Sequence, residues 1–250
     1  NNNYHLPVKK ITINMAPADL RKEGSAYDLT LAIGILVASG QIKGEDVDKY
    51  MIMGELSLDG GLQPIKGALS IAIKAKEEGF KGFFLPIQNV KEAAIVSGLD
   101  VYGVENVTQV IDFFEGKNTL EPTVIDTRKE FYKTLEFPEF DFSDVKGQES
   151  IKRCMEIAAA GGHNIILIGP PGSGKTMLAK RLPSILPPMT LKEALETTKI
   201  HSVAGKIKDA GLMNQRPFRS PHHTASSVSL VGGGSYPQPG EISLSHNGVL

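Results

Sequence analysis

Hydrophobic and polar positions recur with two periods over the first 116 residues, and together they predict a mixed α/β domain. The run KKITINMAP at residues 9–17 alternates with period two, which is typical of a strand, and places Ile11 and Ile13 on one face. A helical stripe follows from Leu29 to Val37. The pattern then predicts a hairpin from residues 50–58 and 62–66 through Asp59-Gly60-Gly61, strands at 82–87 and 100–104, and helices at 69–75, at 90–96 and before Gly116.

Residues 117–140 predict a linker between this domain and a second one at residues 141–250. The segment is charged, contains two prolines and lacks a long hydrophobic stripe. Beyond it, Ser143 or Asp144 is expected to cap an amphipathic helix that stops at the glycines before residue 163. A further helix is expected from Thr190, and the last residues predict a hairpin because 241–245 alternate and Asn247-Gly248 favours a type I′ turn.

The stretch HNIILIGPPGSGKTMLAKRL, residues 163–182, carries the clearest chemistry. The apolar residues 165–168 predict a buried strand, and Met177, Leu178 and Leu182 follow at helical spacing. The turn between them fits G-x-x-x-x-G-K-[ST], the P-loop pattern. The predicted nucleotide-binding residues are Gly169, Pro170, Pro171, Gly172, Ser173, Gly174, Lys175 and Thr176. Lys175 is expected to reach the β- and γ-phosphates of ATP, and the Thr176 hydroxyl to bind Mg²⁺.

Composition narrows the class of protein without changing this prediction. The chain is 250 residues long, 41% hydrophobic and 22% charged, with a formal net charge of −1, so it has no overall basic excess for nucleic acid. The one cysteine, Cys154, cannot form an internal disulfide and is expected in the core. No run approaches eighteen apolar residues and the first residues have no signal-peptide layout, which predicts a cytoplasmic protein without a membrane partner.

Several separated motifs together resemble one family. They are FDFSDVKGQE before the P-loop, RPFRSPHHTAS and QPGEISLSHNGVL after it, and VKKITINMAPADLRKEGSAYDLTLAIGILVASGQI near the start. The combination is similar to the magnesium-chelatase-like branch of AAA+ ATPases, in particular its ComM (YifB-type) subgroup. The resemblance implies a Lon-protease-like (ribosomal-protein-S5-domain-2-like) α+β domain followed by a P-loop AAA+ α/β domain.

The resemblance also implies further site residues and a function. It nominates Val145, Lys146 and Gly147 for the adenine pocket, and it places the acidic pair for Mg²⁺ and water after HNGVL. Because the chain also starts without Met, we expect a chain truncated at both ends that does not hydrolyse ATP efficiently by itself. By the same resemblance, the parent is expected to be a homo-oligomeric, hexameric ring that moves along or remodels DNA during recombination in natural transformation. The glycine-rich hairpin before residue 241 is expected to project into the pore of that ring.

A Lon-like domain raises the question of Ser–Lys peptidase chemistry. Aligning KEGSAYD and QPIKGALS with the Lon pattern places Ala26 at the nucleophile position and Leu69 at the lysine position. Neither side chain can do this chemistry, and Ser25 and Lys66 are expected to be surface residues. We therefore predict no peptidase activity and a role for the domain in assembly or partner binding.

The stretch RPFRSPHH offers candidate contacts for nucleic acid. Arg216 and Arg219 could meet phosphates while Phe218 stacks on a base; alternatively, the arginines pair locally in a loop ordered by its prolines. His222-His223 is a weak metal candidate because neighbouring side chains diverge. Two other functions stay open at this point: the motor subunit of a metal chelatase, and a non-hydrolysing scaffold for protein partners.

Overall fold

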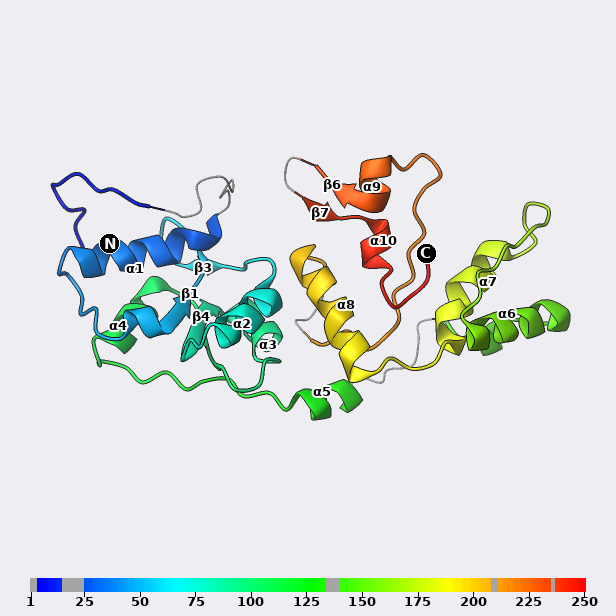
Figure 1. The fold of residues 1–250 in the computed structure, drawn as a ribbon, viewed down its shortest axis with the longest axis horizontal. Helices are drawn as coiled ribbons and strands as arrows, with labels where there is room; N and C mark the ends of the chain where they lie inside the picture. Colours follow the sequence, from blue (N-terminus) through cyan, green and yellow to red (C-terminus); the bar gives the residue numbers. More distant parts are fainter. Residues whose placement is uncertain (1–3, 15–24, 134–139, 208–210, 235–236) are drawn as a thin grey trace. The chain divides into compact units, whose positions relative to one another are not determined.

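The computed structural model describes residues 4–14, 25–133, 140–207, 211–234 and 237–250. They divide into two compact units, and the chain passes from the first to the second between Thr127 and Arg128. Figure 1 draws the elements of each unit in sequence colours. Within the described ranges, no helix is both long and apolar enough to cross a membrane.

The first unit is built on a parallel sheet, which confirms the α/β prediction for this part of the chain. The strand order is β1-β4-β5, and Phe84 at the centre of β4 lies between Ile52 and Tyr102. Parallel neighbours need crossover connections, and helices supply them here. The strands are β1 (Tyr50–Ile52), β4 (Gly82–Pro86) and β5 (Asp100–Val104), and the helices in the crossovers are α2 (Ala68–Glu77) and α3 (Val90–Ala93).

Helices cover both faces of this sheet (Figure 1). Phe84 contributes to a core with α1 (Asp28–Ala38) and α4 (Val107–Phe114), whereas Phe83 and Leu85 contribute to a second core with α2 and α3. This alternation follows from the period of two along a strand. All five residues of β4 are buried, as the apolar run GFFLP predicts.

Two strand predictions in this unit need correction. Residues 9–14 form no strand, and Ile11 and Ile13 are 42% and 49% exposed; residues 15–17 of the predicted strand lie outside the described residues. The predicted hairpin is shorter than expected, because β1 pairs with β4 and only β2 (Glu55–Leu56) and β3 (Leu62–Gln63) pair as a hairpin. An alternating pattern identifies a possible strand but not its partner.

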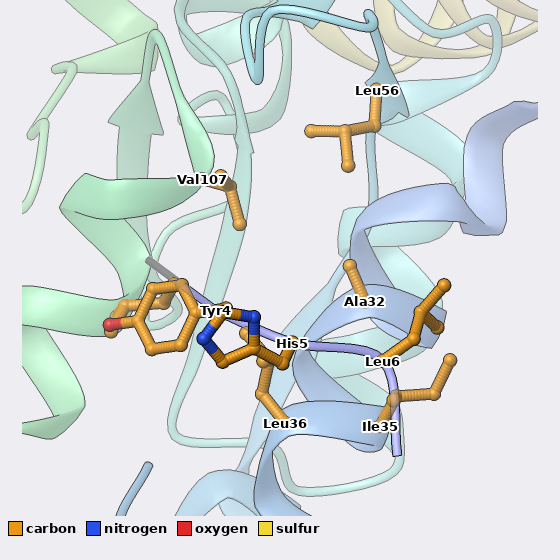
Figure 2. A pocket seen from close by; sticks show the side chains of 9 residues that line it. Tyr4, His5, Leu6, Ala32, Ile35, Leu36, Leu56 and Val107 are labelled. Carbon is orange, nitrogen blue, oxygen red and sulfur yellow. The ribbon is translucent and has the colours of Figure 1, made fainter. Parts of the chain in front are cut away.

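An apolar groove of about 340 Å³ lies beside α1 (Figure 2). Its floor includes Ala32 and Leu36 of α1 and Val107 of α4, and the segment Tyr4–Leu6 runs along it. Gln41 holds this segment, since its side-chain amide accepts from His5 N at 2.9 Å and donates to His5 O at 2.7 Å.

The predicted linker is ordered over much of its length. Thr123 N donates to Val101 O at 2.8 Å, and Thr127 Oγ1 donates to Ile95 O at 2.9 Å, so the segment up to Thr127 lies on the first unit. The helix α5 (Thr127–Lys133) then lies inside the predicted linker. Residues 134–139 are outside the described part.

The second unit has a small core around the base of the P-loop helix. Phe142, Val145, Met155 and Leu178 are buried together there. Cys154 is exposed, so its prediction as a core residue is wrong; the adjacent Met155 fills that role. After α5, the described α-helices of this unit are, in chain order, α6 (Glu149–Gly161), α7 (Lys175–Arg181), α8 (Leu191–Val203), α9 (Ser227–Val231) and α10 (Glu241–Leu244).

The helix ends test the predicted caps. Thr190 caps α8 as predicted, and Glu193 reciprocates in a capping box. The glycine stop of α6 is also confirmed, because Gly162 is left-handed with φ 63°. The predicted start of α6 is wrong: Asp141 caps a 3₁₀ turn over Phe142–Asp144, and the helix begins only at Glu149.

Two predicted strands of the second unit are absent. Residues 165–168 form no strand, and Ile166 and Ile168 are 82% and 87% exposed; no described strand lies beside them to satisfy their backbone groups. Residues 241–244 form α10 instead of a strand, because a helical turn buries Leu244 against α8. The glycine-rich segment does form a hairpin, between β6 (Gly232–Gly233) and β7 (Gln238–Pro239).

Candidate nucleotide-binding site

The P-loop pattern forms a tight turn that ends at the first residue of α7. Gly172 and Gly174 have φ values of 80° and 85°, which residues with a Cβ rarely adopt. The backbone conformation of the turn therefore favours glycine at both positions. Gly174 is the N-cap of α7, and Lys175 and Thr176 open the helix. Backbone N–H groups at this helix start have no intrahelical partner and attract anions.

The Lys175 ammonium lies inside the loop that precedes it. Its Nζ donates to Gly169 O at 2.7 Å, to Pro170 O at 2.8 Å and to Ser173 Oγ at 3.3 Å. These three bonds use the three donors of an ammonium group. The geometry fixes a positive charge where the turn and the helix start converge.

Thr176 is exposed on the first turn of α7, next to Lys175. A hydroxyl is a hard oxygen ligand that suits Mg²⁺ when phosphate oxygens and waters complete the coordination. Among the described residues, no group of three or more His, Cys, Asp or Glu side chains could hold a metal ion without such help. The described residues therefore fit a Mg²⁺ site at Thr176 that depends on a bound nucleotide, and they form no metal site that is independent of one.

The segment Val145–Gln148 lies against the P-loop helix. Val145 is 2% exposed and shares a core with Leu178, so its side chain packs inward, whereas Lys146 and Gly147 are exposed. Gln148, which the sequence did not single out, has a left-handed backbone with φ 58°, and its Nε2 lies 3.7 Å from the position of a Cβ built on Gly174. The structure therefore brings the nominated adenine segment next to the P-loop.

Arg181 fixes this arrangement from the end of α7. Its Nε donates to Asp141 O at 3.0 Å, and its Nη2 lies 3.4 Å from Asp144 Oδ2. Nothing in the sequence pattern distinguished Arg181 from other basic residues of the helix, because its partners lie about forty positions earlier in the chain.

Comparison with known proteins bears on both units. A family model described as magnesium chelatase, subunit ChlI, matches residues 141–250, and a second described as subunit ChlI of Mg-chelatase matches residues 1–89. The uncharacterized protein YifB of Escherichia coli strain K12 is 47% identical over the whole of this chain and 48% of its own length. The competence protein ComM of Haemophilus influenzae is 43% identical over the whole chain and 49% of its own length.

The chain belongs to the magnesium-chelatase-like proteins of the ComM/YifB type. It spans about half the length of the curated relatives it matches. An archaeal Lon protease from Methanothermobacter thermautotrophicus is 36% identical over 88 residues, which is 35% of this chain and 14% of that protein. The family resemblance expected from the sequence motifs is confirmed.

In this ComM/YifB-type chain, the two positions aligned with the Lon dyad hold apolar side chains that pack into the first unit. Leu69 is fully buried, and its backbone N donates to Glu92 Oε1 at 2.9 Å. Ala26 packs against the core of the first unit that contains Phe83 and Leu85. Lys66 is exposed, as expected, and Ser25 is half-buried. No side chain at the two aligned positions can act as nucleophile or base.

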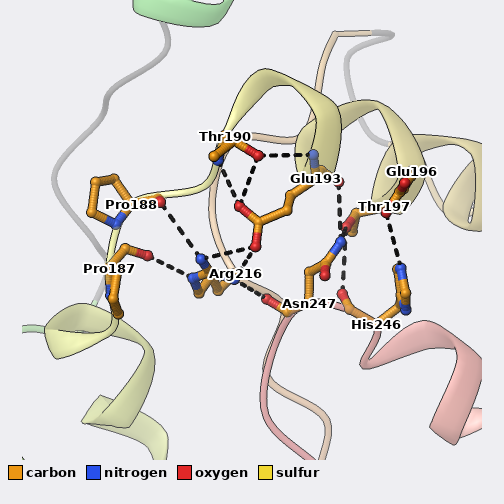
Figure 3. Close-up of polar contacts among 9 residues, drawn as sticks. All are labelled: Pro187, Pro188, Thr190, Glu193, Glu196, Thr197, Arg216, His246 and Asn247. Carbon is orange, nitrogen blue, oxygen red and sulfur yellow. Dashed lines mark hydrogen bonds and ion pairs between the residues drawn. The ribbon is translucent and has the colours of Figure 1, made fainter. Parts of the chain in front are cut away.

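Arg216 is the centre of a polar cluster that joins three segments of the second unit (Figure 3). Its Nε donates to Pro187 O at 2.6 Å and its Nη1 to Asn247 O at 2.7 Å. Nη1 and Nη2 also lie 3.4 and 3.3 Å from Glu193 Oε1. With only 15% of its side chain exposed, Arg216 follows the local-pairing alternative.

The other candidates in RPFRSPHH are also held locally. Arg219 makes two hydrogen bonds to Glu241, at 2.5 and 2.6 Å, and Phe218 is half-buried and forms a backbone bridge to Val249. The rings of His222 and His223 lie 4.2 Å apart, and His222 Nδ1 contacts Thr224 Oγ1 at 2.7 Å. Within the described residues, no third metal ligand accompanies the two histidines.

Proposed function

We propose that the full-length protein is a cytoplasmic P-loop ATPase that forms a homo-oligomeric ring, hexameric by family resemblance, and acts as a motor on DNA. The observation that carries the proposal is the position of Lys175 Nζ, between the carbonyls of Gly169 and Pro170 and directly beside the start of α7. A bound phosphate chain offers this ammonium stronger, charged acceptors than two neutral carbonyls.

Each residue of the site has a role in this proposal. Lys175 neutralises the charge that develops on the transferred phosphoryl group, and the P-loop N–H groups orient the phosphates for in-line attack by water. Mg²⁺, when bound through Thr176, supplies further neutralisation of that charge. Val145, Lys146 and Gly147 border the base, with Gln148 between them and Gly174.

DNA as the substrate is supported by the kinship with the competence protein ComM and not by a basic surface. The net charge of −1 gives no general attraction to phosphate, and Arg216 is committed to its intramolecular cluster. A DNA contact therefore has to come from a local site.

ATP hydrolysis by the full-length protein tests this function. We expect turnover that rises with protein concentration and with single-stranded or branched DNA, and that is lost in Lys175→Ala. Lys180→Ala is the matched control, because Lys180 is an exposed lysine on the same helix outside the P-loop. An ATP turnover rate that is the same with and without every DNA tested would contradict the DNA motor.

A second candidate is the motor subunit of a magnesium chelatase, which the family models over residues 1–89 and 141–250 favour. The similarity to an archaeal Lon protease counts against it, because metal insertion calls for no protease-like domain. ATP-dependent Mg²⁺ insertion into a porphyrin with a partner subunit, in the absence of any DNA effect, is the result expected of this alternative. A protein that binds partners without any ATP turnover would instead be a scaffold.

A further inference from the structure

A cavity of about 380 Å³ opens beside Arg219 in the second unit, and none of its lining residues belongs to the P-loop. It lies where the loop 219–225 passes α9 and the start of α10. Its polar lining consists of Arg219, Ser220, His222, Thr224, Ser229 and Glu241. Ser220, His222 and Thr224 of the loop are exposed, so a solute can reach them.

Glu241, the only carboxylate among the described residues that line this cavity, is already neutralised. Glu241 accepts from Arg219 Nε at 2.5 Å and Nη2 at 2.6 Å, and Lys206 Nζ lies 4.0 Å from Glu241 Oε1. The hydrogen bonds from Arg219 hold the pKa of Glu241 below its ordinary value, so the carboxylate is charged at neutral pH. Two cations against one anion leave a formal local charge of +1, and Arg219 Nη1 has no acceptor among the described residues.

Three of the remaining polar groups of the wall can donate, whereas the Thr224 hydroxyl contacts His222 Nδ1 at 2.7 Å. His222 Nδ1 accepts from the backbone N of Thr224 at 3.4 Å, so a neutral ring carries its proton on Nε2. The hydroxyls of Ser220 and Ser229 have no partner within the described part of the chain. A guanidinium N–H, an imidazole N–H and two hydroxyls therefore line a cavity whose own charged side chains, Arg219 and Glu241, cancel, while Lys206 adds a positive charge beside Glu241.

We propose that this cavity binds a phosphate group of the DNA backbone. The proposal rests on the proposed function and assigns it a contact point. Converging N–H and O–H donors with a partly free guanidinium suit a phosphate oxyanion. Among the described residues, no Phe, Tyr or Trp lines the cavity and His222 is its one ring, so its donors favour the backbone over a stacked base and contact DNA without regard to sequence.

Two substitutions on one helix test the proposal in the full-length protein. Ser229→Asp places a carboxylate in the cavity, whereas Ser227→Asp adds the same charge to α9 at a position that does not line it. Both positions lie in the first turn of α9, where an acidic residue is favourable, so neither variant is expected to unfold the protein. His222→Ala removes the imidazole donor, and His223→Ala is its control because His223 does not line the cavity.

The readout is the affinity for a fluorescent single-stranded oligonucleotide as a function of salt. We expect Ser229→Asp and His222→Ala each to weaken binding about tenfold, the usual effect of losing one hydrogen bond to a charged group. The slope of log affinity against log salt should become smaller in magnitude in Ser229→Asp, by the amount that corresponds to about one phosphate contact. Ser227→Asp and His223→Ala should bind as the wild type does.

Equal affinities for Ser229→Asp and Ser227→Asp, in a protein that binds DNA, would overturn this site while leaving the DNA motor standing. Absence of DNA binding in every variant, the wild type included, would overturn both. Inorganic phosphate is the second probe, followed through the His222 ring resonances. A shift that Ser229→Asp abolishes, together with unchanged DNA affinity, would assign the cavity to a free oxyanion and overturn the DNA assignment.

Discussion

Arg216 donates from both terminal guanidinium nitrogens to one oxygen of Glu193, at 3.4 and 3.3 Å (Figure 3). Glu193 is also the capping-box residue of α8, and the backbone and side-chain hydrogen bonds from Thr190, with a smaller effect of Arg216, lower its pKa. One carboxylate thus fixes a helix start and a loop that is more than twenty positions away.

Removal of Arg216 should be costly for this reason. We expect Arg216→Ala to lower the free energy of unfolding by about 2 kcal/mol, since it leaves the Pro187 and Asn247 carbonyls and one carboxylate without their shared donor. Chemical denaturation measures the change. Arg153→Ala is the control, because that side chain is 73% exposed and pairs only with Glu156. Similar losses in both variants would contradict the central position of Arg216.

Glu241 should make stability depend on acid. Its pKa is lowered mainly by the Arg219 hydrogen bond, so its contribution is complete above the ordinary value of 4.5 and is lost as the pH falls through the lower folded value. We expect Glu241→Gln to be less stable than the wild type at pH 7, and the difference to shrink below about pH 4.5. Urea denaturation at a series of pH values measures it. A difference that stays constant with pH would show that the charge of Glu241 has no part.

His201 should make stability depend on pH in a higher range than Glu241 does. It is 6% exposed, its Nε2 lies 3.0 Å from Leu244 O, and burial lowers its pKa below the ordinary value of 6.5. The unfolded chain therefore binds more protons between the folded value and 6.5, so stability should decline as the pH falls below 6.5. In His201→Gln this decline should vanish while the amide still reaches Leu244. Unfolding free energies at pH 7.5 and 5.5 compare the two proteins, and equal slopes would refute the prediction.

Two glycines of the first unit should respond oppositely to alanine. A Cβ on Gly103 would lie 2.3 Å from Val90 Cγ2, because α3 packs directly on β5 there, so Gly103→Ala should destabilise by about 1–3 kcal/mol. Gly34 lies in the interior of α1 with nothing within 4 Å, so Gly34→Ala should stabilise by up to about 1 kcal/mol. Calorimetry of the two variants measures both, and the same sign in both would be the contrary result.

Lys175 should control ligand-induced stabilisation. We expect ATP with Mg²⁺ to raise the Tm of the full-length protein, and Lys175→Ala to abolish the rise while leaving the Tm without ligand nearly unchanged, because Lys175 is bonded only within its own loop. Thr176→Ala should keep ATP binding but lose the additional effect of Mg²⁺. An undiminished ATP shift in Lys175→Ala would contradict the nucleotide site.

The sequence by itself determined the elements whose partners are local or whose pattern is unambiguous. The P-loop pattern fixed the turn before α7, Thr190 and Glu193 fixed the start of α8, and the apolar run at 82–86 fixed a fully buried strand. Each of these depends on contacts within a few residues or on a continuous apolar run, and both can be recognised in the sequence alone.

Tertiary structure decided what depends on distant partners. The alternating segments at 9–14 and 241–244 became an irregular segment and a helix, because strand formation needs a neighbouring strand, and burial of Leu244 against α8 favours a helical turn. The arginines of RPFRSPHH could not be assigned from spacing, because their acceptors, Glu193 and Glu241, are brought to them only by folding. The sequence gives the sign of each charge, but the tertiary fold decides which carboxylate each arginine contacts.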